Sequence, residues 1–431
     1  MAHDRQYQTA IVGGGLAGLT AAVILGRAGV RTIVLERASH LGGRADSQET
    51  KGFTLNVGPH AIYRAGLAIK TLESLVGPIT GGIPRSSGTT GLRDGRLGRL
   101  PGTAGALLTT TLLGVRGKLD LVRFLTAIKK VRVETLDALT IGEFLDRSLS
   151  VPDARLLAEA LVRVSTYTNA PREMSAQAAV EQLRIALRAG VLYVHGGWKT
   201  IVERLRAAAV PAGVDVVTDA RTIAVEGDGR VTGVATADGR EIAASSAILA
   251  VSPSEAAALL PDERGARLRD VTRSATPVRV STLDIGLARM PRKDPWFVLG
   301  IDRPLYLSVH SDAAALAPSG GGTIHAMKYL GDEAPQGAEK ELEDLLDLAQ
   351  PGWRDELVIK RPLSSMTVTH VLPKPGGGLA GRPAVSVPEM DGLFLAGDWV
   401  GPAGWLADAA IVSAACAARN VLAGLSERAA A

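Results

Sequence analysis

The sequence predicts an α/β fold in which both ends of the chain build one dinucleotide-binding domain and the middle is inserted as a second domain. Three observations carry this prediction. A strand, a glycine-rich turn and a helix follow one another near the N-terminus, over residues 9–27. A similar strand, loop and helix close the chain from residue 392 onward. Between them, helical spacing of apolar residues gives way to strand-like runs after residue 214, which indicates an α+β insertion.

The N-terminal unit is predicted to be a strand, a helix and a second strand. Thr9–Val12 is short and apolar, as expected of a buried strand. Leu16–Arg27 is rich in Ala and Leu and contains no proline, which suits a helix, and Gly29 stands where a helix-ending glycine belongs. Arg31–Leu35 is the next strand, and Glu36 directly follows it.

The middle of the chain divides into a helical part and a strand-rich part. From about Leu100 to Leu187 the apolar residues follow the i, i+3, i+4, i+7 spacing of helices. Two such stripes are Leu121, Phe124, Leu125 and Ile128, then Leu156, Leu157, Leu161 and Val164. From Val214 to Ala250, short apolar runs separated by Asp-Gly and Gly-Arg turns predict a β meander that includes Val216–Val217. Further strands are predicted at Val278–Leu287, Leu305–Val309, Thr323–Tyr329 and Gly392–Gly397, and a final helix from about Leu406 to Leu422.

We expect the dinucleotide-binding domain to be discontinuous. A length of 431 residues allows two or three structural units. The expected segments of this domain are residues 1–85, 190–275 and 385–431, and residues 86–189 and 276–384 form a substrate-binding domain with a helical lobe.

Composition excludes several classes of function. The formal net charge is only +4, and no Lys/Arg cluster with interleaved aromatic residues occurs, so we expect no nucleic-acid partner. The only cysteine is Cys416, and the seven histidines are scattered, so we expect no disulfide within the chain and no metal site. Gly-x-Ser-x-Gly is absent, which argues against a hydrolase nucleophile elbow.

The chain is expected to be cytoplasmic. Its start, Met1–Gln8, is short and polar and does not resemble a secretory signal. The longest uncharged stretch, Leu100–Val115, is shorter than the roughly 20 residues that span a bilayer. We therefore predict no transmembrane helix.

The glycine-rich turn carries the strongest functional signal. Gly13-x-Gly15-x-x-Gly18 directly follows a predicted strand and opens a predicted helix. Gly13 permits the sharp turn, Gly15 leaves room for a pyrophosphate, and Gly18 lets helix and strand pack closely. The helix N-terminus then offers free N–H groups and partial positive charge. Glu36 is placed to accept hydrogen bonds from the ribose hydroxyls, and an acid there disfavours a 2′-phosphate.

Further motifs extend this pattern. After Glu36 come Leu41-Gly42-Gly43-Arg44 and Val57-Gly58-Pro59-His60, and later His195-Gly196-Gly197-Trp198 and Gly392–Asp398 with Gly404–Ala407. Together these segments resemble the flavoprotein superfamily of monoamine oxidases, protoporphyrinogen oxidase and carotenoid (phytoene) desaturases. The resemblance implies a Rossmann-type FAD-binding domain and an FAD-dependent oxidoreductase. About half of the chain, the substrate-binding part, carries no motif of this kind.

The resemblance also implies roles for individual residues. Gly13, Gly15, Leu16, Ala17 and Gly18 would line the pyrophosphate, and Glu36 with Arg37 would lie beside the ribose. Gly43 and Arg44 would reach the phosphates or ribityl chain, Thr222 and Ile223 would offer backbone groups to the adenine, and Gly397 and Asp398 would meet the ribityl or phosphate region. Gly58, Pro59 and His60 would lie beside the isoalloxazine, and Trp405, Leu406 and Ala407 would present the last helix to the flavin.

Several of these residues have a second interpretation. Arg44 is also compatible with an ordinary surface arginine, and Asp398 with a turn cap. His60 is either a proton carrier or a histidine that only packs near the cofactor. Trp405 is either an aromatic that stands over the flavin or a packing residue.

Two departures from the amine oxidases shift the expected substrate. Their lysine near flavin N5 is missing from the matching strand Val278–Ile285, and Lys328 lies on a later strand. Gly286-Leu287 and the Gly392–Leu395 ending look more like the carotenoid-desaturase branch. Cys416 lies inside the final helix and not after the last strand, so we expect FAD to be bound non-covalently. The resemblance thus favours hydride transfer from an isoprenoid or polyene substrate. An amine or amino-acid oxidase and a flavin-holding protein without turnover are the alternatives, and the electron acceptor and oligomeric state stay open.

One basic segment has a possible membrane role. Residues 116–132 carry six Lys and Arg residues beside the first apolar stripe. Such a helix either lies at a membrane interface or presents a solvated basic face over its own domain, and the second interpretation is favoured.

Overall fold

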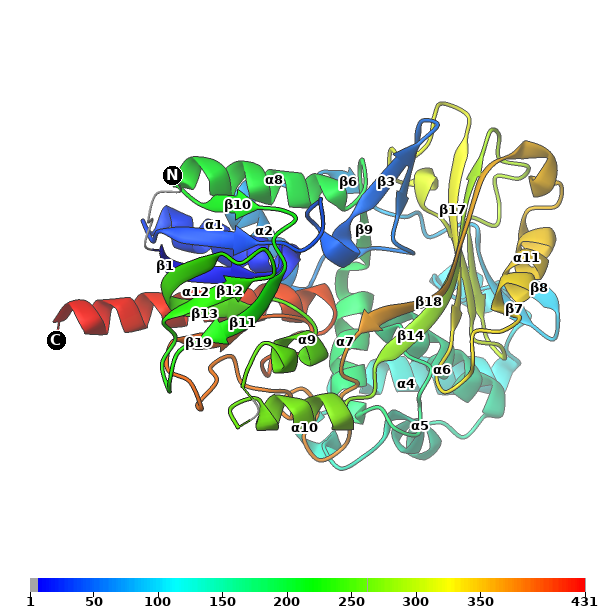
Figure 1. Ribbon diagram of the computed structural model, residues 1–431. Helices are drawn as coiled ribbons and strands as arrows, with labels where there is room; N and C mark the ends of the chain where they lie inside the picture. Colours follow the sequence, from blue (N-terminus) through cyan, green and yellow to red (C-terminus); the bar gives the residue numbers. More distant parts are fainter. Residues whose placement is uncertain (1–6, 262, 431) are drawn as a thin grey trace.

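Two seven-stranded sheets organise the computed structural model, which describes residues 7–261 and 263–430 (Figure 1). The first sheet lies with α1, α8 and α12 in one half of the molecule, and the second lies with α4–α6 and α11 in the other half (Figure 1). The prediction of a polar start without a signal peptide falls mainly on residues 1–6, outside the described residues.

The first sheet joins strands from both ends of the chain. Strand β13 pairs parallel to β1 on one side and to β19 on the other. Its members are β1 (Tyr7–Val12), β2 (Thr32–Leu35), β10 (Asp215–Val217), β11 (Thr222–Glu226), β12 (Gly233–Thr236), β13 (Glu241–Leu249) and β19 (Leu393–Leu395). The prediction that the two ends contribute to one α/β unit is confirmed.

Apolar helices cover this sheet. Helix α1 (Leu16–Arg27) packs against α8 (Lys199–Ala209) and α12 (Ala407–Ala430). The predicted bounds of α1 are confirmed, and Gly29 has a φ of +76°, which favours glycine at the helix end. Side chains such as Ile11, Leu25 and Val34 are fully buried in the shared core.

Helix α12 is unusually long and apolar. Residues 407–428 are the one stretch, within the described part of the chain, that is long and apolar enough to cross a membrane. A core helix of a folded domain meets the same criteria of length and composition, and α12 packs against α1 and α2 (Leu67–Val76).

The predicted meander is partly wrong. Only β11, β12 and β13 form an antiparallel meander. Val216 and Val217 belong to β10, which pairs parallel with Val34 and Leu35 of β2. A short apolar run indicates a buried strand but not its partner, and here β10 follows helix α8, which packs against α1.

The second sheet contains the three middle strands predicted from the sequence. Their bounds agree closely with β14 (Val278–Leu287), β16 (Leu305–Val309) and β17 (Gly322–Tyr329). The other members are β7 (Thr89–Arg93), β8 (Arg96–Arg99), β15 (Phe297–Gly300) and β18 (Leu357–Thr369). Helix α11 (Ala338–Ala349) packs on one face, so the opposite face is turned toward the rest of the molecule.

The helical lobe follows the predicted apolar stripes. It consists of α3 (Ala104–Thr109), α4 (Val115–Ala127), α5 (Ile141–Ser148), α6 (Pro152–Thr166) and α7 (Ala176–Ala189). Leu121, Phe124 and Ile128 are buried in its core, which confirms the first stripe. The smaller elements are β3 (Ser47–Thr50), β4 (Phe53–Asn56), β5 (Ile62–Tyr63), β6 (Gly81–Gly82), β9 (Val191–Val194), α9 (Pro253–Ala258) and α10 (Ala266–Ser274).

Candidate cofactor-binding and active site

The glycine-rich turn lies where β1 passes into α1. Gly13 has a φ of +106°, and a Cβ there would come within 2.5 Å of the Ala250 carbonyl oxygen. A Cβ on Gly18 would lie 1.9 Å from the Gly13 carbonyl oxygen. A Cβ on Gly15 would meet nothing closer than the Gly42 oxygen at 3.7 Å. The fold itself therefore requires Gly13 and Gly18, whereas the space at Gly15 fits an external group.

The first turn of α1 is suited to an anion. Gly15 is the N-cap residue and supplies no side-chain hydrogen bond to the N–H groups of Leu16 and Ala17. No acidic residue lies in this turn. Because the first N–H groups of a helix have no partner inside it, a bare N-terminus of this kind attracts phosphate. The predicted roles of Leu16 and Ala17 fit this geometry and stay predictions.

Glu36 is fixed beside the turn. Its Oε2 accepts from the Gly14 N–H at 2.7 Å, and its Oε1 accepts from the Ala38 N–H at 2.9 Å. Each carboxylate oxygen keeps a further lone pair for a hydroxyl donor. Arg37, by contrast, is exposed and forms an ion pair with Glu255 of α9.

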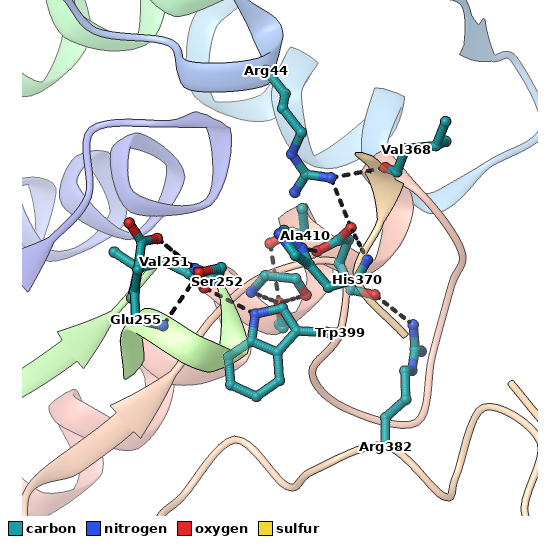
Figure 2. Close-up of polar contacts among 12 residues, drawn as sticks. Arg44, Val251, Ser252, Glu255, Val368, His370, Arg382, Trp399 and Ala410 are labelled. Atoms are coloured by element: carbon teal, nitrogen blue, oxygen red, sulfur yellow. Dashed lines mark hydrogen bonds and ion pairs between the residues drawn. The ribbon is translucent and has the colours of Figure 1, made fainter. Parts of the chain in front are cut away.

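Arg44 binds Asp398, and Figure 2 shows Arg44 with two further partners of this aspartate, His370 and Arg382. Arg44 Nη1 donates to Asp398 Oδ2 at 2.9 Å and to the Val368 carbonyl at 2.8 Å. His370 Nδ1 lies 2.9 Å from Asp398 Oδ1, and Arg382 donates to the Asp398 carbonyl at 3.0 Å (Figure 2). This network joins the segment after β2 to the segments after β18 and β19.

The network keeps Asp398 ionised. Burial alone would raise the pKa of Asp398, but attraction to Arg44 and the hydrogen bond with His370 outweigh it and hold the pKa far below its ordinary value. The side chain of Arg44 stays 42% exposed, so part of it is open to a ligand. The predicted contacts of Gly43, Arg44, Gly397 and Asp398 with a cofactor stay predictions. The sequence did not indicate His370 or Arg382 as partners.

The N-terminus of α12 meets the N-terminus of α2. Asp408 Oδ1 accepts from the Ala68 N–H at 2.8 Å, and burial raises the pKa of Asp408. Leu406 has a φ of +56° just before Ala407 begins the helix. No role was predicted for Asp408 from the sequence. An acidic residue at the start of an Ala-rich helix was the pattern that could have indicated it.

Trp405 lies in the core of the helical lobe. Its side chain is buried, and its indole N–H donates to the Thr166 carbonyl at 3.0 Å. These contacts account for a packing role, and a contact with the cofactor stays a prediction.

The Gly58-Pro59-His60 segment faces the second sheet. A Cβ on Gly58, whose φ is +76°, would lie 2.7 Å from Met366 Cε and 3.2 Å from Thr282 Cγ2. Burial lowers the pKa of His60 to about 4, so its imidazole is neutral at pH 7. Its Nδ1 lies 3.1 Å from the Gly58 carbonyl oxygen, which makes Nδ1 the protonated nitrogen.

The predicted adenine segment contains an irregularity. The register between β11 and β12 shifts between Thr222 and Ala224, which leaves Ile223 out of the ladder. The backbone of Ile223 is thus available to an external partner. The Gly196-Gly197 turn instead packs on the β3–β4 hairpin, where Asn56 accepts from the Trp198 N–H at 3.0 Å.

Comparison with protein families identifies one match. The model described as "Flavin containing amine oxidoreductase" matches residues 16–283, more than half of the chain. Carotenoid phi-ring synthase of Streptomyces griseus is 34% identical over 189 residues, which are 39% of this chain and 36% of that protein. Carotenoid 3,4-desaturase of Haloarcula japonica is 47% identical over 49 residues, 11% of this chain and 10% of that protein. The chain thus spans about a third or less of the length of these curated relatives.

Solved structures share the fold over nearly the whole chain. An oxidoreductase from Methanosarcina mazei has a TM-score of 0.75 at 19% identity, over 95% of this chain and 99% of that one. Cyclohexylamine oxidase from Brevibacterium oxydans has a TM-score of 0.67 at 18% identity, over 97% of this chain and 100% of that one. At these identities the likeness establishes the architecture alone.

Proposed function

Because the chain belongs to the flavin-containing amine oxidoreductase family, we propose that it oxidises a small apolar organic substrate, with an isoprenoid or polyene as the substrate class. The observation that carries this proposal is the apolar and aromatic cluster on the face of the second sheet opposite Gly58. We keep the division into segments 1–85, 190–275 and 385–431, with 86–189 and 276–384 between them, as the proposed domain organisation.

The cofactor of the chain is FAD, and the site described above fits it. We propose that the first turn of α1 holds the pyrophosphate, that Glu36 holds the ribose, and that Arg44 reaches the phosphates or ribityl chain. Bound FAD accepts a hydride at its N5 atom and so supplies the two-electron oxidation. Cys416 packs against the core from inside α12, which supports non-covalent binding.

The face of the second sheet toward Gly58 carries an apolar and aromatic cluster beside the buried polar residues Thr282, Asp284 and His325. Val280, Tyr306, Met327 and Tyr329 form a buried cluster there, with Tyr167, Phe297, Met366 and Val368 packed against it. Lys328, on the opposite face of β17, pairs with Glu333 and with Glu341 of α11. An apolar substrate gives up no strong hydration when it leaves water for this cluster, whereas an unpaired charge would. This arrangement supports desaturation of a hydrocarbon substrate.

One feature favours the alternative of amine oxidation. The rings of Tyr167 and Tyr329 lie 6.4 Å apart in an edge-to-face arrangement, and burial raises the pKa of both phenols. Neutral aromatic rings can hold an ammonium group through their π faces. Cyclohexylamine oxidase and putrescine oxidase have the same fold.

We further propose that helices α3 and α4 contact an anionic membrane surface. Leu108, Val115, Leu119 and Val122 are large apolar side chains between 43% and 78% exposed. Three of them follow i, i+4, i+7 along α4, on the side opposite the buried Leu121 and Phe124. Arg116, Lys118 and Arg123 lie on α4 with this stripe, and Lys129, Lys130 and Arg132 follow the helix in the chain. An exposed apolar stripe with basic flanks is typical of interfacial helices and would bring the enzyme to a lipid-dissolved substrate.

The function is tested by reduction of the bound flavin. Purified holoprotein is mixed anaerobically with a linear polyene in detergent, and in parallel with a panel of primary amines. Bleaching of the flavin absorption by the polyene supports the proposal. Bleaching by amines alone, with peroxide formed in air, replaces it with the alternative. Protein that takes up no FAD contradicts both.

A further inference from the structure

A buried carboxylate and a buried imidazole lie side by side on two adjacent strands of the second sheet. Asp284 of β14 stands directly opposite His325 of β17, and both side chains are fully buried. His325 Nδ1 lies 2.6 Å from Asp284 Oδ1. A pair of this kind is costly to bury unless its charges and hydrogen bonds are matched.

Arg361 of β18 supplies the matching charge. Its Nη2 donates to Asp284 Oδ2 at 2.6 Å, and its Nε donates to the same oxygen at 3.2 Å. The guanidinium also reaches Gln48 and the Asn56 carbonyl, so it ties the β3–β4 hairpin to the sheet. Arg361 thus places a positive charge against the side of Asp284 that does not face His325.

The geometry then determines which nitrogen of His325 is available. A carboxylate oxygen only accepts hydrogen bonds, so Nδ1 carries the hydrogen and Nε2 of the neutral ring presents a lone pair. His325 Nε2 has no hydrogen-bond partner among the described residues. This is the arrangement by which an acid orients an imidazole to accept a proton at its far nitrogen.

His325 Nε2 is one of three such atoms on the same face. Thr282 Oγ1 and Tyr329 Oη are also buried without a partner in the described chain, and all three residues point to the same side of β14 and β17. Buried polar atoms in native proteins are nearly always satisfied. Thr282 is one of the two residues, with Met366, that a Cβ on Gly58 would contact, so the face that carries the three atoms lies against the segment expected beside the flavin ring.

We propose that His325, oriented by Asp284, is the base that accepts the proton released when the substrate is oxidised. The inference rests on the proposed function but not on the choice between its two substrate classes. Asp284 and Arg361 are positioning residues, since they act through His325. The titratable groups around the imidazole are Asp284 on β14, Arg361 on β18, His310 after β16 and His60 before β5, with Tyr193 and Tyr306 beyond His310.

Both reactions release one proton for each hydride. In desaturation, one C–H bond gives up hydrogen with its electron pair to the flavin. The C–H bond of the neighbouring carbon breaks, its electron pair forms the new double bond, and its proton goes to His325 Nε2. In amine oxidation, the nitrogen loses the proton to His325 Nε2 and the carbon gives up the hydride. The neighbouring rings of His60 and His310 are held neutral by burial, so they do not repel the imidazolium that forms.

The test combines a spectroscopic measurement with a kinetic one. Because the chain has only seven histidines, selective ¹⁵N-histidine labelling of the holoprotein resolves their ring nitrogens. At pH 7 the resonance pair that disappears in H325Q is expected to show a protonated Nδ1 and an unprotonated Nε2. D284N, which removes the acceptor of the Nδ1 hydrogen, is expected to change this tautomer. If His325 carries its hydrogen on Nε2, or is doubly protonated at every pH at which the protein is folded, the inference is overturned.

Anaerobic flavin reduction supplies the second measurement. With the compound that reduces the wild-type flavin, H325Q is expected to slow reduction by about 10²-fold or more and to flatten its pH profile. The matched control is E341Q, which loosens the Lys328 ion pair on the opposite face of β17 and should leave rate and profile unchanged. Wild-type rate and pH profile in H325Q would overturn the assignment. Failure of every compound to reduce the wild-type flavin would count against the proposed function alone, because the tautomer measurement needs no substrate.

Discussion

Arg44 and Asp398, which are 354 positions apart in the chain, form an ion pair with an Nη1–Oδ2 distance of 2.9 Å. The contact joins the segment that follows β2 to the segment that follows β19, and it lies at the expected middle of the cofactor. A single interaction thus links the two ends of the chain and prepares a guanidinium for a ligand.

The first prediction concerns this ion pair. D398N is expected to lower the free energy of unfolding by roughly 2–3 kcal/mol, because it leaves Arg44 and His370 without a buried anionic partner. D391N is the control, since Asp391 pairs with Arg230 at the surface and both are more than half exposed. Its effect should stay below about 1 kcal/mol. Urea unfolding measures both, and equal losses would contradict the prediction.

The same pair predicts a pH dependence. The pKa of Asp398 is lower in the folded protein than its ordinary value of 3.8. Its stabilising contribution is therefore fully present above that value and is lost as the pH falls below it. The stability difference between the wild type and D398N is expected to shrink below about pH 4. Thermal unfolding from pH 3 to pH 7 tests this, and a constant difference would refute it.

Gly15 and Gly18 are predicted to have different roles, one in FAD binding and the other in the stability of the fold. G18A places a methyl group against the Gly13 carbonyl and is expected to destabilise the fold strongly. G15A meets no close protein atom, so the protein should fold normally but bind FAD at least tenfold more weakly, a cost of about 1.4 kcal/mol or more. Calorimetric titration of apoprotein with FAD measures the affinity. Wild-type affinity for FAD in G15A would contradict the proposal that this turn binds the pyrophosphate.

Asp408 is predicted to cost stability at neutral pH. Burial raises its pKa in the folded protein, so the protonated form is favoured there and stability is lost as the pH rises through the raised pKa. D408N keeps an oxygen that can accept from the Ala68 N–H but carries no charge. It should be closest to the wild type at acidic pH and more stable than the wild type at pH 7. A variant that is less stable at pH 7 would show that the carboxylate is needed ionised at the start of α2.

The exposed stripe on α4 is predicted to bind anionic vesicles. Wild-type protein should float with vesicles that contain phosphatidylserine. High salt should release it, because salt screens the attraction between the basic residues and the anionic lipid headgroups. L119D is expected to abolish flotation. L187D is the control, since Leu187 on α7 is 45% exposed but lies outside the stripe. Absence of flotation by the wild type would contradict the proposal and leave a solvated basic face over the protein's own domain as the correct interpretation.

Much of the fold was predictable from local patterns. The bounds of α1, the buried stripe of α4 and the strands β14, β16 and β17 follow from the spacing of apolar residues and from glycine placement, which act over a few positions. The β1–α1–β2 unit with Glu36 was predictable for the same reason. Val216 and Val217 were correctly expected as a strand but in the wrong place, because periodicity does not specify a partner.

The sequence by itself determined a dinucleotide-binding fold and the turn that would hold the diphosphate, since these depend on neighbouring residues and on the steric freedom of glycine. Only the tertiary structure decided that Arg44 meets Asp398, that β18 brings Arg361 to Asp284, and that Asp284 meets His325 across the strands. These partners lie 41 to 354 positions apart. Their encounter depends on which strands pair and in which register, and that is set by burial over the whole chain.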